Sequence, residues 1–289
     1  MTLRIDAHQH FWAYGADPAQ YAWMAGAYSG LRQNFGPPDL EPLLKQTGFA
    51  GTVAVQARNS LVENDYLLAL ADRHAFILGV VGWLDLADEN VGVLVAHYAA
   101  KPKFRGVRVT LTGAESDVAK LNGVSALNAR GLTLDVLLGP DQIASAIQLA
   151  DRFPGQPIVI DHIAKPPIGA TMDPSWRDAM AELALRPNVS CKLSSLITQD
   201  DWSAWSAARI EPYLDHVLRL FGPGRLMIGS DWPVCTVAAD YATTVSVVID
   251  WLGRLDAIER NAIVGGNCRA FYGLHIADRQ PIPASGAAA

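Results

Sequence analysis

The chain has 289 residues, of which 50% are hydrophobic and 18% are charged, a composition that supports a large core and excludes a disordered protein. The formal net charge is −6 and no basic cluster stands out, which argues against a nucleic-acid partner. The main apolar run, 77–84, is far shorter than the ~20 residues of a membrane-spanning helix, so we expect no membrane partner.

The N-terminal segment and the cysteines of the chain indicate the cellular compartment in which we expect the protein. The first strand begins by about Leu3, which leaves no room for a secretion signal and makes the cytoplasm the expected location. Cys191, Cys235 and Cys268 are odd in number and widely spaced, so we expect free thiols and no thiolate zinc site. The sequence leaves the oligomeric state open.

Short β-branched runs alternate with helical patterns along the chain. The predicted strands are 3–8, 51–57, 77–84, 104–110, 132–138, 157–163, 189–196 and 225–232. Helical periodicity between them is clearest over 64–75, 141–153, 175–185 and 212–221. Eight strand–helix units predict a single-domain (β/α)8 barrel over residues 1–275. An open doubly wound sheet is the alternative, but no GxGxxG turn follows the first strand.

Two segments fall outside this repeat. Residues 11–37, rich in Trp, Tyr, Gly and Pro, form a long loop after the first strand, where loops commonly cover a barrel active site. Residues 276–289 end in "PIPASGAAA", which predicts a flexible tail.

Four residues stand where barrel enzymes place their chemistry, at the C-terminal ends of strands. His8 and His10 are two positions apart on the first strand, so their side chains project to the same face. His162 ends the sixth strand and Asp231 the eighth, which neighbours the first in a closed barrel. Alternatively, His162 is a core histidine beside a functional Asp161, or Asp231 serves only as a turn residue.

Motifs at these strand ends resemble the amidohydrolase superfamily, within it the branch of lactonases that act on sugar lactones and on 2-pyrone-4,6-dicarboxylate. They are "RIDAHQHFW" at 4–12, "DHIAKP" at 161–166, "KLSSL" at 192–196 and "GSDWPV" at 229–234. The resemblance covers nearly the whole chain apart from the tail. It implies a hydrolase that opens a sugar lactone.

The resemblance also implies roles for the four strand-end residues. His8, His10 and His162 would polarise the lactone carbonyl, and Asp231 would activate water and then protonate the leaving ring oxygen. The wider superfamily's two-metal site needs a Lys or Glu from strand 4 and a His from strand 5. Those strands end "VRVTL" and "DVLLG", so we expect no dinuclear site.

Two alternatives remain for a metal. The residues His8, His10, His162 and Asp231 are suitable ligands for one Zn²⁺, although four protein ligands would leave no open tetrahedral position. Otherwise the histidines polarise the carbonyl themselves and no metal is required. A serine nucleophile is disfavoured because no GxSxG appears and Ser230 faces away from Asp231.

Aromatic and polar residues near strand ends are candidates for substrate binding. Indole faces pack well against sugar rings, although each Trp can equally well be core or loop packing. The substrate-binding candidates are Trp23, Gln56, Arg58, Trp83, Arg108, Lys165 and Trp232, with Trp12 and Asn59 beside them. Lys192 lies either at this rim or inside the barrel wall.

A dicarboxylate substrate would need several arginines at the mouth of the barrel to bind its carboxylates, and Arg58 and Arg108 are the two arginines placed near strand ends there. We therefore favour a neutral sugar lactone, of the fuconolactone or rhamnonolactone kind, as the small-molecule partner. Three other functions remain: a 2-pyrone-4,6-dicarboxylate-type lactonase, a metal-dependent decarboxylase on the same scaffold, and a catalytically silent ligand-binding barrel.

Overall fold

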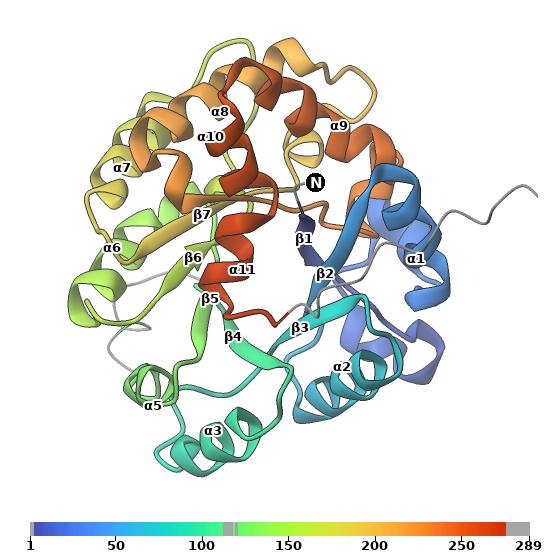
Figure 1. The fold of residues 1–289 in the computed structure, drawn as a ribbon, viewed down its shortest axis with the longest axis vertical. Coiled ribbons are helices and arrows are strands. Elements are labelled where there is room, and N and C mark those ends of the chain that lie inside the picture. The colour runs from blue at the N-terminus through green and yellow to red at the C-terminus, as the bar shows by residue number, and fades with distance from the viewer. Residues whose placement is uncertain (1–2, 112–117, 119–120, 276–289) are drawn as a thin grey trace, which may run out of the picture.

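Eight parallel strands in chain order line the centre of the molecule (Figure 1). The computed structural model describes residues 3–111, 118 and 121–275, so the predicted tail 276–289 lies outside the described residues. The strands are β1 Arg4–Gln9, β2 Phe49–Val55, β3 Ile77–Gly82, β4 Phe104–Thr110, β5 Thr133–Leu137, β6 Ile158–Ile160, β7 Val189–Leu193 and β8 Leu226–Ile228.

The first and last strands meet through the residues just beyond them. The backbone N–H of His10 donates to the carbonyl of Trp232 at 2.7 Å, and that of Asp231 donates to the carbonyl of His8 at 2.8 Å. These bonds continue the sheet from β8 to β1. The predicted (β/α)8 barrel is therefore confirmed, and closure brings Asp231 beside the histidines of β1.

Helices surround the strands in Figure 1, as parallel βαβ connections require. Side-chain and glycine caps set several of their ends: the Ser60 hydroxyl accepts from Val62 N–H before α2, and Gly48, at φ 75°, ends α1. The helices are α1 Pro37–Thr47, α2 Leu61–Arg73, α3 Val91–Ala99, α5 Val124–Ala129, α6 Ile143–Arg152, α7 Pro174–Ala184, α8 Ala207–Phe221, α9 Tyr241–Trp251, α10 Ala257–Asn261 and α11 Asn267–Phe271.

The end of the barrel away from the site is filled by the C-terminal helical segment. In Figure 1, α11 crosses in front of the strands. A Cβ added at Gly265, just before α11, would lie 2.0 Å from the carbonyl oxygen of Leu3, so only glycine fits this approach to β1. An apolar cluster fills the interior here and includes Ile5, Val53, Val81, Val159, Met227 and Cys268.

Six of the eight strands end before their predicted last residue, and left-handed backbone explains the early ends of β6 and β8. β6 stops at Ile160 because residues His162–Lys165 all have positive φ, between 46° and 60°, and β8 stops at Ile228 before Asp231, whose φ is 58°. Left-handed backbone cannot continue an extended strand. The chain therefore turns across the end of the barrel and carries His162 and Asp231 over its opening.

The predicted long loop, 11–37, folds into short 3-10 turns over Tyr14–Ala16, Pro18–Tyr21 and Gly26–Leu31. A small apolar cluster of Trp12, Tyr21, Met24 and Leu31 holds these turns together. Across the described part of the chain, no helix is both long enough and apolar enough to cross a membrane.

Candidate active site

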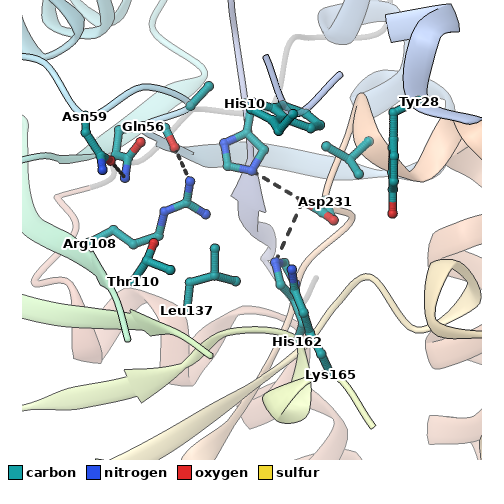
Figure 2. Close-up of a pocket in the computed structure, with 13 residues that line it drawn as sticks. His10, Tyr28, Gln56, Asn59, Arg108, Thr110, Leu137, His162, Lys165 and Asp231 are labelled. Carbon is teal, nitrogen blue, oxygen red and sulfur yellow. Dashed lines mark hydrogen bonds and ion pairs between the residues drawn. The ribbon is translucent and has the colours of Figure 1, made fainter. Parts of the chain in front are cut away.

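Three imidazoles converge on one carboxylate at the C-terminal end of the barrel. The Asp231 Oδ1 atom lies 3.3 Å from Nε2 of His10, 3.7 Å from Nε2 of His8 and 4.0 Å from Nε2 of His162. The Nε2 atoms of His8 and His10 are themselves 3.2 Å apart, which confirms that the two side chains project together. Figure 2 shows Asp231 facing both His10 and His162.

A buried carboxylate behind the site fixes these strand ends relative to each other. Asp6 Oδ1 accepts the backbone N–H of His8 at 3.2 Å and that of Ser230 at 2.9 Å. Its Oδ2 accepts the hydroxyls of Ser230 at 2.7 Å and Tyr241 at 3.1 Å. Ser230 thus points away from the site, as predicted, and ties the backbone beside Asp231 to β1.

The other nitrogen of each imidazole has its own partner. His10 Nδ1 lies 2.8 Å from the carbonyl of Val55 and must donate to it, which leaves the lone pair on Nε2. His162 Nδ1 lies 2.8 Å from the hydroxyl of Ser194. His8 Nδ1 lies 3.1 Å from Nζ of Lys192. Each ring is thereby held in one orientation.

The electrostatics favour a carboxylate among neutral imidazoles. Burial lowers the pKa of His8 well below its ordinary value and lowers that of His162 to about 4. Burial also opposes ionisation of Asp231, but the neighbouring imidazoles of His162, His10 and His8 outweigh it and bring its pKa below the ordinary value. Ser195 adds to this, because its hydroxyl donates to Asp231 Oδ2 at 2.5 Å.

A network of charged residues lies inside the barrel beneath His8. Lys192 Nζ is 2.5 Å from Asp135 Oδ2 and 3.1 Å from Asp161 Oδ1, and the hydroxyl of Tyr272 donates to Asp135 Oδ2 at 2.7 Å. Burial disfavours charge on Lys192, yet the two carboxylates raise its pKa above the ordinary value, so it is an ammonium. We call Asp135, Asp161, Lys192 and Tyr272 the floor network.

A cavity of about 400 Å³ opens above the three imidazoles, within the size range of small-molecule sites. Figure 2 shows Arg108, Gln56 and Asn59 on the wall across from Asp231 and Tyr28. The lining residues, which we call the mouth, are His10, Trp23, Tyr28, Gln56, Ala57, Asn59, Arg108, Thr110, Leu137, His162, Lys165, Asp231 and Val234.

A model of the amidohydrolase family matches residues 5–274 of the chain. The chain belongs to the amidohydrolase family. Two L-fucono-1,5-lactonases are similar to this amidohydrolase, one from Burkholderia ambifaria at 38% identity and one from Burkholderia multivorans at 39%. Each alignment covers 94% of this chain, with 96% of the first relative and 97% of the second. A zinc-bound amidohydrolase from Burkholderia multivorans superposes with a TM-score of 0.89 at 38% identity, covering 94% of this chain and all of that one.

Several residues predicted to bind substrate do lie in the mouth of the amidohydrolase. Trp23 lines the cavity with 43% of its surface exposed, and Gln56, Arg108 and Lys165 line it too. Arg108 is already engaged, since its guanidinium donates to the carbonyl of Gln56 and lies 3.7 Å from Asp161 Oδ2. The Lys165 side chain makes no hydrogen bond or ion pair within the described ranges, so its ammonium is available to a ligand in the cavity.

Three predicted substrate-binding residues are absent from the cavity lining. The Arg58 guanidinium pairs with Glu63 at 2.8 Å. Trp232 is buried, with its ring 5.5 Å from that of Phe35, centroid to centroid. The backbone of Trp83 is held by the side chain of Asn64 on α2. All three follow strands as expected, but their side chains are not in the mouth.

Sequence reasoning missed Tyr28, Thr110 and Leu137 of the mouth and Ser195 behind Asp231. Thr110 and Leu137 end β4 and β5, so the same strand-end rule that found Asp231 also applies to them. It also missed the partners of Lys192, whose signal is a charge within an apolar strand: "LTLDVLL" around Asp135 and "VSCKL" around Lys192. Lys192 is fully buried inside the barrel, not at its rim.

The donor set fits a single divalent cation. Two groups of residues have ligand atoms within 4.8 Å of one another, His8 with His10 and Asp231, and His8 with Asp161 and His162. Tetrahedral zinc with ligand bonds of ~2.0–2.1 Å places its ligand atoms about 3.3 Å apart. The 3.2 Å and 3.3 Å separations of His10 Nε2 from His8 Nε2 and Asp231 Oδ1 match that spacing.

Proposed function

We propose that this amidohydrolase is a lactonase that opens a sugar 1,5-lactone of the L-fucono type to the sugar acid. The observation that carries the proposal is the Asp231 carboxylate, which meets three imidazoles at the base of a cavity large enough for a sugar ring. The two similar L-fucono-1,5-lactonases support the substrate class. The decarboxylase, the dicarboxylate lactonase and the silent barrel are not favoured.

Asp231 moves the protons in this proposal. Its Oδ1 takes a proton from the attacking water as the water oxygen bonds to the lactone carbonyl carbon, and later gives that proton to the ring oxygen as the ring C–O bond breaks. The Oδ2 atom remains held by Ser195 during both transfers. No covalent enzyme intermediate is formed, and the product is a hydroxy acid.

His162 supports the negative charge that develops on the carbonyl oxygen by donating its Nε2–H, because its Nδ1 can accept the Ser194 hydroxyl, whereas the Nε2 lone pair of His10 is suited to a cation. His10 and His162 line the cavity, whereas His8 is fully buried beneath them. A divalent cation held by His8, His10 and Asp231 would, when bound, add Lewis-acid polarisation of that carbonyl. Zinc is our proposal for this cation, on the chemistry of the donor set and the zinc-bound relative.

The walls of the mouth favour a neutral ligand with one polar face. Trp23 and Tyr28 offer aromatic surface to the sugar ring, while Gln56, Asn59 and Lys165 offer groups that can bind its hydroxyls. A dicarboxylate would need more than one free cation. Arg108 is engaged by Asp161 and the Gln56 carbonyl, which leaves Lys165 as the unpaired cation among the described mouth residues.

A panel of lactones followed with a pH indicator tests the proposal, because each ring opening releases acid at neutral pH. The panel contains L-fucono-1,5-lactone, its stereoisomers, the matching 1,4-lactones and 2-pyrone-4,6-dicarboxylate. We expect the highest kcat/KM among the 1,5-lactones. Preference for the pyrone dicarboxylate would refute the substrate class, and an absence of turnover on every lactone would favour a silent barrel.

A further inference from the structure

Two side chains of the mouth end in a lysine or arginine cation, and the protein neutralises them differently. Arg108 donates to the carbonyl of Gln56 and lies 3.7 Å from Asp161 Oδ2. The half-buried Lys165 side chain makes no hydrogen bond or ion pair within the described ranges. Partial burial of an ammonium without a partner is costly, which indicates that a negative or strongly polar ligand group completes it.

The backbone that carries Lys165 is held in a conformation that residues other than glycine rarely adopt. His162, Ile163, Ala164 and Lys165 all have positive φ, and Ile163 is β-branched. The backbone N–H of Lys165 donates to the carbonyl of His162 at 2.8 Å, and the Trp176 indole donates to the carbonyl of Ile163 at 3.0 Å. Such strain clusters where it positions functional groups, and here it brings His162 and Lys165 to one cavity.

Both side chains lie at the end of the mouth where the carbonyl would react. Figure 2 shows His162 and Lys165 extending from this turn towards Asp231. Burial lowers the pKa of the Lys165 ammonium, and Asp231, the charged group that acts on it most strongly, raises it. The lactone carbonyl must lie beside Asp231, because that carboxylate activates the attacking water. The Lys165 ammonium is therefore close to the reacting group.

The reaction proposed above places negative charge on the carbonyl oxygen. As the water oxygen bonds to the carbonyl carbon, Asp231 takes a proton and the electron pair of the C=O π bond moves to the oxygen. The pair returns when the ring C–O bond breaks and Asp231 protonates the ring oxygen. The new acid then releases its own proton to solvent and leaves a carboxylate. His162 supplies one donor to this oxygen, whereas oxyanion sites typically combine several.

We propose that Lys165 is the second oxyanion donor: its ammonium hydrogen-bonds the carbonyl oxygen as that oxygen becomes negative, and then holds the product carboxylate. A charged donor favours the oxyanion over the neutral carbonyl, so the contact strengthens in the transition state. One strained turn thus provides both donors. The inference rests on the proposed function, and its first test reads ligand binding without turnover.

Two ligands that cannot be hydrolysed test the preference of Lys165 for negative charge. They are the product anion L-fuconate and 1,5-anhydro-L-fucitol, a neutral ring with the hydroxyls of the lactone but no carbonyl. Calorimetry gives their Kd values in preparations of matched metal content. Lys165→Met should weaken L-fuconate binding at least about tenfold and leave binding of the neutral ring within about twofold, because only the anion loses a charge-assisted hydrogen bond. Equal weakening of both ligands would overturn the proposal, since Lys165 would then bind a sugar hydroxyl.

Asn59→Ala is the matched control, because Asn59 is an uncharged polar residue of the same mouth. It should weaken binding of the two ligands by similar factors. A loss selective for L-fuconate in this variant would contradict the assignment to the charge of Lys165. If wild-type protein binds neither ligand, the proposed substrate falls and this inference with it, whereas equal weakening in Lys165→Met overturns the inference alone.

Steady-state kinetics separate an oxyanion donor from a residue that only binds the ground state. Lys165→Met should lower kcat by ~10²- to 10³-fold with a smaller change in KM, the scale for loss of one oxyanion donor. Lys165→Arg keeps the charge and should recover part of that loss. A higher KM with unchanged kcat in Lys165→Met would overturn the proposal. If circular dichroism shows that Lys165→Met does not fold, Lys165→Gln replaces it, with the same losses expected.

Discussion

The mouth and the floor network of this amidohydrolase both contain charged side chains inside the barrel, yet they differ in what those side chains face. In the mouth, Asp231 Oδ1 and the Lys165 ammonium face a cavity. In the floor network, Lys192 and Asp135 are fully buried and bonded to each other. The difference teaches that charged groups open to a cavity mark the chemistry, whereas the buried charges below set the orientation of its side chains.

The largest expected effect in the mouth is that of Asp231→Asn. The amide nearly keeps the size of the carboxyl but cannot accept a proton from water at neutral pH. General acid–base groups contribute ~10²- to 10⁴-fold, so kcat should fall by about that factor. Steady-state kinetics on a lactone, with circular dichroism and a melting curve as the folding control, make the measurement. A folded variant close to wild type in kcat would move the proton transfers to His162.

The matching change in the floor network should act on stability. Asp135→Ala removes the acceptor of both Lys192 and Tyr272 and leaves a buried ammonium short of a partner. Breaking a buried ion pair costs about 3–5 kcal/mol, which should appear as a lower free energy of unfolding in urea. Tyr272→Phe, which removes one hydroxyl from the same carboxylate, should cost much less. An equal free energy of unfolding for Asp135→Ala and wild type would show that the ion pair between Asp135 and Lys192 does not stabilise the fold.

A smaller effect is expected from Ser195→Ala, which removes the hydroxyl behind Asp231. Without the hydroxyl, Asp231 Oδ2 loses its 2.5 Å hydrogen bond and the carboxylate is free to rotate. Because a hydrogen bond to a charged group is worth ~1.5–3 kcal/mol, we expect kcat to fall at least about tenfold with little change in KM. Thr198→Val is the control, since it touches Ser195 but not Asp231. An equal fall of kcat in both variants would mean that the effect comes from disturbing the segment around Ser195 and Thr198, and not from the hydrogen bond to Asp231.

The smallest effect concerns Trp23, which is 43% exposed at the rim of the mouth. Stacking on the sugar ring acts on ground and transition states alike, so Trp23→Ala should raise KM and leave kcat nearly unchanged. Trp83→Ala is the matched control, because Trp83 also follows a strand but does not line the cavity. An unchanged KM in Trp23→Ala would show that Trp23 packs within its loop and does not bind the substrate.

The sequence predicted the barrel from periodicity, and it predicted the four converging residues from periodicity together with their positions at strand ends. Alternation on β1 placed His8 and His10 on one face, and the strand-end rule placed His162 and Asp231. The early ends of β6 and β8 were not predicted, because they depend on positive φ at non-glycine residues, which local sequence does not signal.

The sequence also could not predict in which direction a side chain points once it lies beyond the end of a strand. Arg58 follows β2 as expected, but Glu63 on α2 accepts its guanidinium. Trp232 follows β8, but its indole packs with Phe35 from the first loop. For Lys192 the sequence left rim and wall open, because the deciding partner, Asp135, comes from a strand far away in the chain.

The central claim, that Asp231 acts as a base on water, is tested most directly by one turnover in water enriched in the heavy oxygen isotope. Enzyme in excess of L-fucono-1,5-lactone is quenched after a single turnover, and the product and the peptide that contains Asp231 are weighed by mass spectrometry. Our account predicts one heavy oxygen in the new carboxylate of the sugar acid and none in Asp231. Heavy oxygen in the Asp231 peptide would reveal a covalent intermediate and contradict the account, as would the absence of any turnover.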